Sequence, residues 1–337
     1  MRNRIEKQAS ALSSWCRCGR SLAALTAVLW SAAALAQAPR EKATLPFQLG
    51  ATPVVAFSPD GKLLAVATED SNAPVIALWD VTTGKTRGVL RGHKMAGNVG
   101  IVSLAFSADG KVLATGAGDK TIKLWDLAKG KERAPLQVGD IHPPSQLRFS
   151  ADGKVLAASV GVPNDFRIKV WSLTTGKEMS SYAEKIQVGW VDLSPDGKTI
   201  AWTGDGVVKL GNATTGKEQS SWPHEGLEKV AFSPDGKKLA SANAKVKLWD
   251  VASGKELFTT PEAAAARSLE FTADGTKLAV GCGTTELKIF DAAGGKELAS
   301  YKVEKLEFYV RAITRDGKRV VTGNFAMGKL WDLPPIK

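Results

Sequence analysis

An Asp-Gly dipeptide recurs seven times along the chain, and this repeat constrains the fold more than any other feature. Each copy is followed, about a dozen residues or more later, by an aromatic-acidic pair or a variant of it, with a period of roughly 40 residues. The dipeptides begin at Asp60, Asp109, Asp152, Asp196, Asp235, Asp274 and Asp316. The matching pairs are Trp79-Asp80, Trp125-Asp126, Trp171-Ser172, Leu210-Gly211, Trp249-Asp250, Phe290-Asp291 and Trp331-Asp332. Such a period indicates a propeller, because each repeat is one unit that cannot bury its own faces.

The second repeat shows what one unit contains. Residues 101–106 and 112–117 predict two strands, and Asp109-Gly110 between them predicts a tight turn, since glycine supplies the positive φ. Residues 121–125 predict a third strand, and a fourth follows the turn at Gly130. The unit is therefore a four-stranded antiparallel meander, and the chain is expected to be all-β.

The repeats also carry longer shared strings, namely FSPDGKLLAVA, FSADGKVLATGAGDKTIKLWD and FSPDGKKLASANAKVKLWD. These strings resemble the WD-repeat family in the form common in bacterial chains. The resemblance implies a seven-bladed propeller around a central channel. The last repeat stops at Leu333, before a fourth strand, and residues 43–50 precede the first blade without a blade of their own. We therefore expect this N-terminal segment, with the strand-like run 45–49, to complete the last blade.

The first 36 residues differ in composition from the repeats. Five basic residues precede an apolar and small-residue run from Ser21 to Ala36, which ends in Ala34-Leu35-Ala36. This pattern predicts a secretory signal peptide over 1–36, followed by a short linker over 37–42 and the propeller over 43–337. A retained membrane anchor is the alternative. Cleavage would lower the formal net charge from +11 to +7, because five basic residues and one acidic residue are lost.

Export restricts the compartment in which the protein works and the classes of partner that it can meet. We expect a periplasmic or extracellular protein without a membrane span after cleavage, and export argues against a nucleic-acid partner despite the basic charge. Cys282 would be the single remaining cysteine, typical of a small buried side chain. A closed ring has no free sheet edge to pair with another copy, so a monomer is expected.

Two groups of side chains are expected to have structural roles. The resemblance implies a hydrogen-bonded tetrad of His, Ser or Thr, Asp and Trp, and the second repeat alone offers a full set: His93, Thr115, Asp119 and Trp125. Charged residues also replace alanine on the inner strands of blades three, four and six, at Arg148, Asp192 and Glu270. Arg148 and Asp192 belong to neighbouring blades at one level, so they predict an ion pair between blades, since a buried charge without a partner is costly.

The connections on one face of blades one to three are the irregular ones. Loops that depart from the minimal turn are where binding residues concentrate, although drift of an unused surface is the alternative. The predicted partner-binding residues are Glu69, Asp70, Asn72, Lys94, Met95, Asn98, His142, Asn164, Asp165 and Phe166.

No motif for a nucleophile, haem attachment or zinc site is present, so we expect no catalytic residue, metal or cofactor. The leading interpretation is a non-enzymatic, exported scaffold that binds a protein whose identity the sequence does not specify. One alternative is a periplasmic propeller enzyme or ligand-binding protein that uses Asp192 and Glu270 in the channel. Another is an envelope-polymer binder that uses the lysines after the Asp-Gly turns.

Overall fold

The computed structural model describes residues 38–45, 54–70, 73–133, 135–136, 138, 143–162, 165–185, 188–204, 206–224, 229–261, 265–283, 286–302, 309–323 and 328–335. All of them belong to one compact unit, Ala36–Lys337, and the predicted signal peptide lies outside the described residues. In the described part every regular element is a β-strand. Accordingly, it contains no helix with the length and hydropathy of a membrane span.

The strands form seven antiparallel sheets of four. Blade one contains β2 (Val55–Phe57), β3 (Leu63–Asp70), β4 (Ala73–Asp80) and β5 (Lys85–Arg91). Blade two contains β6 (Ile101–Phe106), β7 (Val112–Ala117), β8 (Ile122–Asp126) and β9 (Lys131–Glu132). Blade three contains β10 (Ser145–Phe149), β11 (Val155–Val162), β12 (Asp165–Ser172) and β13 (Lys177–Glu184). Blade four contains β14 (Val191–Leu193), β15 (Thr199–Gly204), β16 (Val207–Asn212) and β17 (Glu218–Pro223).

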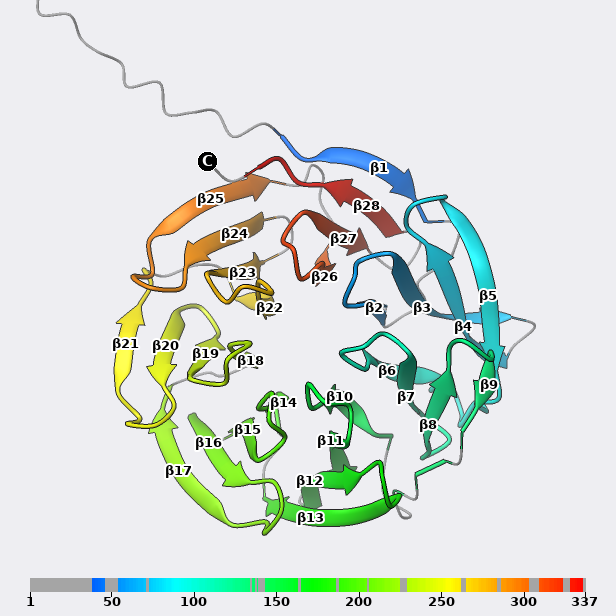
Figure 1. Ribbon diagram of the computed structural model, residues 1–337, viewed down its shortest axis with the longest axis horizontal. Helices are drawn as coiled ribbons and strands as arrows, with labels where there is room; N and C mark the ends of the chain where they lie inside the picture. Colours follow the sequence, from blue (N-terminus) through cyan, green and yellow to red (C-terminus); the bar gives the residue numbers. More distant parts are fainter. Residues whose placement is uncertain are drawn as a thin grey trace, which may run out of the picture. The chain divides into compact units, whose positions relative to one another are not determined.

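Blade five contains β18 (Lys229–Phe232), β19 (Lys238–Ala242), β20 (Val246–Asp250) and β21 (Glu256–Thr259). Blade six contains β22 (Ala266–Phe271), β23 (Lys277–Cys282), β24 (Glu286–Asp291) and β25 (Glu297–Lys302). Blade seven contains β26 (Tyr309–Ile313), β27 (Arg319–Gly323), β28 (Gly328–Asp332) and the N-terminal β1 (Arg40–Thr44). The first strand of each blade lines a central channel (Figure 1). The predicted seven-bladed propeller is confirmed.

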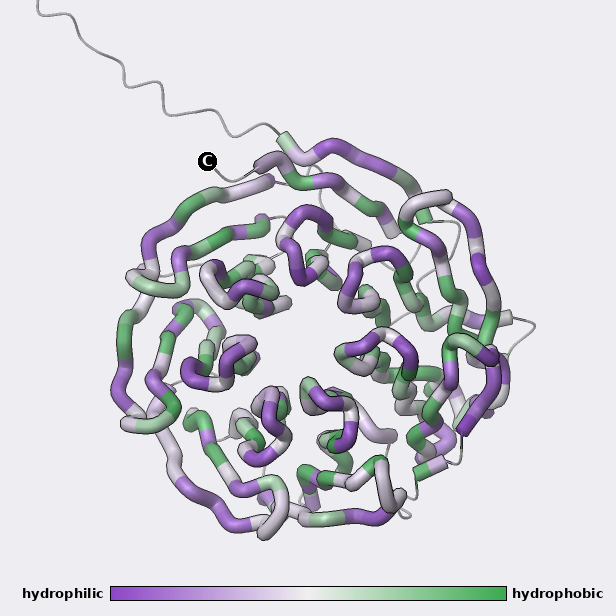
Figure 2. Tube along the Cα trace, viewed as in Figure 1, coloured by the Kyte–Doolittle hydropathy of each residue, from purple (hydrophilic) through white to green (hydrophobic). Residues whose placement is uncertain are grey.

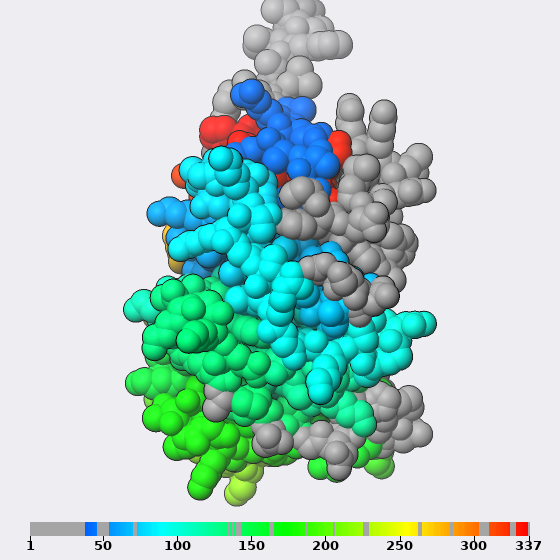
Figure 3. Space-filling model, turned by 90° about the vertical axis from the view of Figure 1, so that its right-hand side faces the viewer, coloured from blue at the N-terminus to red at the C-terminus, as the bar shows by residue number. Residues whose placement is uncertain are grey.

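The ring is closed by the N-terminal strand, as expected, but by an earlier segment. β1 pairs antiparallel with β28 and lies beside it in two views (Figures 1 and 3). It covers Arg40–Thr44, so it begins inside the predicted linker, and residues 46–50 lie outside the described part. The physical reason is a charge match: Glu41 Oε2 lies 2.6 Å from Lys329 Nζ. Leu45 then enters the core, and its N–H donates to the carbonyl of Gly328.

That contact reproduces a pair found in most blades. The third strand carries a lysine two residues before the aromatic position, and a glutamate at the start of the fourth strand binds it. The pairs are Lys123–Glu132, Lys169–Glu178, Lys209–Glu218, Lys247–Glu256 and Lys288–Glu297. Glu41 thus takes the fourth-strand place in blade seven.

The Asp-Gly turns share one hydrogen-bond pattern. In blade one the hydroxyl of Ser58 donates to Asp60 Oδ1 at 2.6 Å, and the N–H of Lys62 donates to the same oxygen at 3.0 Å. Gly61 has φ 66°, which an L side chain rarely adopts. A Ser or Thr binds the Asp in the other six turns as well. In the last-but-one turn, hydrogen bonds led by the Thr272 hydroxyl lower the pKa of Asp274 to about 2.

The core lies within and between the blades, where hydrophobic residues dominate, whereas the turns around the channel are rich in hydrophilic residues (Figure 2). Trp79, Trp171 and Trp202 are among the largest fully buried side chains. Cys282 is buried too, and burial raises the pKa of its thiol to about 11, so it stays protonated and unreactive at neutral pH.

Blade four corrects the sequence alignment by one residue. Gly211, not Leu210, pairs with Ile200, as Trp125 pairs with Leu113 in blade two. Blade four therefore has no aromatic side chain of its own at this position. Tyr182 of blade three occupies the space, because a Cβ built on Gly211 would meet the Tyr182 ring at 2.5 Å. Its hydroxyl donates to the carbonyl of Asn212, and its ring packs 4.8 Å from that of Trp202.

Candidate functional site

The structure brings the four residues of the predicted tetrad together in blade two. His93, before β6, lies with Nε2 2.6 Å from Thr115 Oγ1 and Nδ1 2.9 Å from Asp119 Oδ2. The indole N–H of Trp125 donates to the same Thr115 oxygen at 2.9 Å. Burial opposes ionisation of Asp119, but hydrogen bonds from His93, Thr121 and the Lys94 N–H outweigh it and hold its pKa well below the usual range. Buried contacts of this kind brace a blade.

Blade five contains a related series of hydrogen bonds that the sequence analysis did not predict. His224 Nδ1 lies 2.6 Å from the hydroxyl of Ser241, which also accepts the indole N–H of Trp249 at 2.8 Å. In blade seven the Trp331 indole donates to Thr322 in the same way. The signal was present: a hydroxyl residue stands at the same strand position in all three blades. His224 lies 17 residues before Ser241, whereas His93 lies 22 residues before Thr115, so the two histidines do not share one spacing in the sequence.

Blades one and three lack that hydroxyl. Val66 and Ala158 occupy its position, and both are buried. The indole nitrogens of Trp79 and Trp171 are buried without a hydrogen-bond partner among the described residues. The tryptophans of these two blades therefore contribute packing alone.

Two of the predicted irregular loops are extended β-hairpins. In blade one, β3 and β4 continue their pairing through Glu69–Pro74 and Asp70–Ala73, beyond the common blade length. In blade three, β11 and β12 continue through Gly161–Phe166 and Val162–Asp165. Glu69 is exposed, whereas Asp165 and Phe166 are half-buried. Regular strand pairing gives these arms a rigidity that an irregular loop would lack.

The connection from blade one to blade two packs against the first of these arms. A Cβ on Gly100 would lie 3.3 Å from both Met95 Sδ and Pro74 Cβ, so the two side chains converge over this glycine. Met95 is half-buried by the contact, while Lys94 and Asn98 are exposed. The structure thus brings Met95 beside the hairpin that carries Glu69, and Lys94 and Asn98 belong to the same connection.

The remaining predicted partner-binding positions are less well defined. Asn72, His142 and Asn164 lie outside the described residues, as does the side chain of Asp70. Phe166 is partly a core residue, because it packs against the cluster that contains Ile168 and Trp202. We call the predicted partner-binding residues of blades one to three the contact sector. Its described members are Glu69, Lys94, Met95, Asn98, Asp165 and Phe166, and Glu69, Lys94 and Asn98 are the exposed ones.

The central channel contains the predicted ion pair. Arg148 Nε lies 3.4 Å from Asp192 Oδ1, and the backbone N–H of Phe232 donates to Asp192 Oδ2 at 2.7 Å. Asp192 thus connects blades three, four and five. Burial raises its pKa, and the Arg148 charge opposes the rise.

Glu270 behaves differently, since it is exposed to the channel and has no hydrogen bond or ion pair within the described residues. Desolvation by the surrounding protein raises the pKa of Glu270, and the charge of Arg148 opposes the rise. No cluster of three or more His, Cys, Asp or Glu suited to a metal occurs in the described part of the chain.

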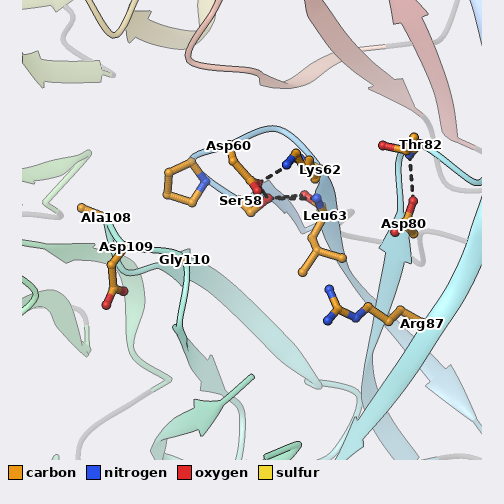
Figure 4. Close-up of a pocket in the computed structure, with 11 residues that line it drawn as sticks. Ser58, Asp60, Lys62, Leu63, Asp80, Thr82, Arg87, Ala108, Asp109 and Gly110 are labelled. Carbon is orange, nitrogen blue, oxygen red and sulfur yellow. Dashed lines mark hydrogen bonds between the residues drawn. The ribbon is translucent and has the colours of Figure 1, made fainter. Parts of the chain in front are cut away.

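A smaller cavity of about 300 Å³ lies between the turns of blades one and two (Figure 4). Asp60, Asp80, Asp109 and Arg87 line it. The carboxylates of Asp60 and Asp80 already accept N–H groups of their own turns, as the dashed lines show. Because the same turn chemistry recurs around the ring, this cavity offers no group specialised for a ligand.

Comparison with known proteins identifies the repeats. The family model described as "WD domain, G-beta repeat" matches residues 84–126 and 216–250. The chain is 29% identical over 212 residues to periodic tryptophan protein 2 of Arabidopsis thaliana, covering 61% of this chain and 22% of that protein. It is 32% identical over 139 residues to WD repeat-containing protein SL1-17 of Schistosoma mansoni, covering 39% of this chain and 46% of that protein. A U3 small nucleolar RNA-associated protein 15 homolog of Xenopus tropicalis is 28% identical over 160 residues, covering 46% of this chain and 30% of that protein.

Two segments of the chain therefore match WD40 repeats, and the chain is similar to WD-repeat proteins. The relatives named here are eukaryotic. The matched regions span less than half the length of each of these relatives.

Proposed function

We propose that this propeller is a non-enzymatic scaffold that binds a protein partner through the contact sector of blades one to three. The observation that carries the proposal is the convergence of Met95 and Pro74 over Gly100. This packing fixes the β5–β6 connection against the β3–β4 hairpin, so the exposed side chains of Glu69, Lys94 and Asn98 stand on a rigid frame. A preorganised surface binds with less loss of conformational entropy than a mobile loop.

The repeat family supports the general role, because WD-repeat propellers typically serve as protein-interaction platforms. The relatives do not specify the partner. One of them is named for association with a small nucleolar RNA. RNA is accordingly a competing ligand class in the test below.

We also propose that the protein is exported, is bacterial in type and works as a monomer in the periplasm or outside the cell. The basic and apolar pattern of residues 1–36 supports export. Cell fractionation with N-terminal sequencing tests it: a mature protein beginning at Gln37 is expected, and an intact N-terminus in the cytoplasm would contradict the proposal.

Crosslinking and affinity capture of the full chain test the scaffold role. A variant with Glu69→Ala, Lys94→Ala and Asn98→Ala is compared with a matched control in blade four, Glu218→Ala, Lys217→Ala and Gln219→Ala. Each triple removes one acid, one base and one amide. We expect a protein captured by wild type and by the control to be lost from the first variant, with equal thermal stability in both.

Three outcomes would overturn this assignment. Equal capture by both variants would remove the contact sector from the interface. Ribonuclease-sensitive capture would replace the protein partner by RNA. Absence of any specific capture would remove the scaffold role itself.

A further inference from the structure

The outer rim of blade one differs from the rims of the other six blades. Each of those blades has a lysine in its third strand that binds a glutamate of its outer strand. In blade one Ala77 stands in place of the lysine, two residues before Trp79. Thr86 stands in place of the glutamate, because it pairs with Trp79 at the same point of the register. Blade one therefore lacks the ion pair that the other rims share.

An apolar pair replaces polar side chains at the same level of this rim. In blades three to seven the lysine lies opposite a serine or threonine of the outer strand. In blade one Ala77 lies opposite Val89, which is 41% exposed. Charged groups at a sheet edge discourage pairing with another chain, and the apolar pair removes that protection here.

The seam between blades one and two is open beside this strand. In blade five, Phe258 of the outer strand fills the equivalent seam, since a Cβ built on Gly295 of blade six would meet its ring at 2.5 Å. Gly88 occupies the position of Phe258 in blade one. A Cβ built on Gly88, or on the turn residue Gly130 of blade two, would meet no described atom within 4 Å. The rim therefore has space beside Gly88 for a side chain of another molecule.

The strand next to this space has a free hydrogen-bonding edge. β5 runs for seven residues, is the last strand of its sheet and pairs with no described strand on its outer side. It lies on the outer rim of the ring, on the side that Figure 3 turns toward the viewer (Figures 1 and 3). An extended segment that adds to such an edge gains affinity from main-chain hydrogen bonds and specificity from pockets for its side chains.

The charges of β5 distinguish among the segments that could add to it. Lys85 and Arg87 are exposed, and neither side chain forms a hydrogen bond or salt bridge with a described residue. Asp80 is the acid whose charge acts on Arg87, and its carboxylate already accepts the N–H groups of Thr82 and Thr83. β5 itself contains no acid, whereas every other outer strand contains a glutamate. Opposite charges on neighbouring strands stabilise their pairing, so an acidic segment fits this edge.

We propose that the rim of blade one binds an extended, acidic segment of a protein, which adds to the edge of β5 and places an apolar side chain beside Gly88. A second copy of the chain fits less well, because it would place one basic β5 against another. The first 36 residues fit less well for the same reason, since they carry five basic residues and one acid. The rim lies outside the contact sector, so this inference goes beyond the proposed function.

Fluorescence anisotropy of the full chain with two panels of labelled peptides tests the site. The peptides match the seven residues of β5 in length. In one panel glutamate alternates with valine, leucine or phenylalanine, and in the other lysine replaces glutamate. We expect binding by the acidic panel alone. Deuterium exchange of the amides of residues 85–91 should slow when an acidic peptide is bound.

Two pairs of variants separate the notch from the charge. Gly88→Phe reproduces blade five and should weaken acidic-peptide binding about tenfold or more, whereas Gly88→Ala should retain it. Lys85→Gln with Arg87→Gln should also weaken binding about tenfold. Lys131→Gln with Arg133→Gln is the matched control, because these two residues occupy the same places in blade two.

The outcomes that would overturn the proposal are distinct. Binding by neither panel, or equal binding by both, would remove the acidic segment. Equal losses in the two double variants would assign binding to the overall charge, and full binding by Gly88→Phe would place the peptide elsewhere. Self-association of the wild type that Gly88→Phe abolishes would assign the rim to a second copy. The contact-sector variant should bind the acidic peptides like wild type, and a loss there would assign the peptides to the contact sector.

Discussion

Blades two and five contain the same three groups, a histidine, a hydroxyl and an indole, and differ in the residue at the turn that follows. Asp119 stands three residues before Ile122 in blade two, and Asn243 stands three residues before Val246 in blade five. Both side chains accept a backbone N–H two residues later through Oδ1. Only blade two has a carboxylate bound to the histidine.

The difference separates two ways of burying a histidine. In blade two the carboxylate gives the ring a charged acceptor and fixes its orientation. In blade five burial dominates, and with the nearby Lys247 charge it lowers the pKa of His224 to about 4. A buried histidine without a carboxylate remains neutral, so it stabilises the fold only while it is deprotonated.

The largest effect is expected from Asp119→Ala. The change leaves His93 Nδ1 and the N–H of Lys94 without their acceptor, and buried polar groups that lose a charged partner are costly. We expect the free energy of unfolding to fall by about 4 kcal/mol. Asn243→Ala, the matched change, should cost about 1 kcal/mol. Urea denaturation of both variants measures the difference, and equal losses would show that the carboxylate adds nothing.

The pH dependence should be set largely by blade five between neutral pH and about pH 4. Because the pKa of His224 is depressed on folding, its contribution is complete above about 6.5 and is lost as pH falls toward 4. The loss should approach about 3 kcal/mol. Asn243→Asp should raise the pKa of His224 and reduce the loss. Denaturation at pH 7 and pH 4.5, with an NMR titration of His224, tests this; a flat wild-type profile would refute it.

A hydroxyl introduced into blade one should stabilise it. Val66→Thr would place an acceptor beside the buried Trp79 indole, which has no partner among the described residues. We expect a gain of about 1 kcal/mol, measured as a higher melting temperature. Val280→Thr is the control in blade six. Phe290 there has no N–H to donate, so the buried hydroxyl should cost about 1 to 2 kcal/mol. Stabilisation of both blades alike would contradict this account of the indole.

The smallest change in stability is expected at the lysine of each outer pair. Lys247 binds Glu256 at 2.9 Å, as Lys123 binds Glu132 in blade two at 2.6 Å. Replacing either lysine by Met should change stability by about 0.5 kcal/mol, as is usual for surface pairs. Lys247→Met should nevertheless raise the pKa of His224, because the lysine charge disfavours protonation. An unchanged His224 titration would show that burial alone depresses this pKa.

The repeat period predicted the blades, their strand order and the closure of the ring, because those depend on regular turn chemistry. It misaligned blade four, since Gly211 removed the aromatic marker and the strand register alone shows the correct position. Tyr182 could not be anticipated, because it reaches that space from another blade. The closing strand was shifted for a similar reason: the run 45–49 alternates like a strand, whereas the observed REKAT segment is selected by its partner Lys329.

The candidate site was predictable to a lesser degree. Residue types and spacing predicted the four residues around His93 and the pairing of Arg148 with Asp192. The hydrogen bond from the Phe232 N–H to Asp192, and the lack of a partner for Glu270 among the described residues, depend on the closed ring. The extension of two hairpins also depends on strand pairing, and polar residues such as Glu69 give no sequence pattern that predicts it.

The pairing of β1 with β28 has a mechanical consequence. Arg40 at the start of β1 lies opposite Asp332 at the end of β28, so the two strand ends that face the chain termini are neighbours. A force pulling those ends apart would load the hydrogen bonds one after another, as in unzipping, and not all together in shear. The propeller should thus yield at low force at this seam, and single-molecule stretching from the two termini should show blade seven opening first.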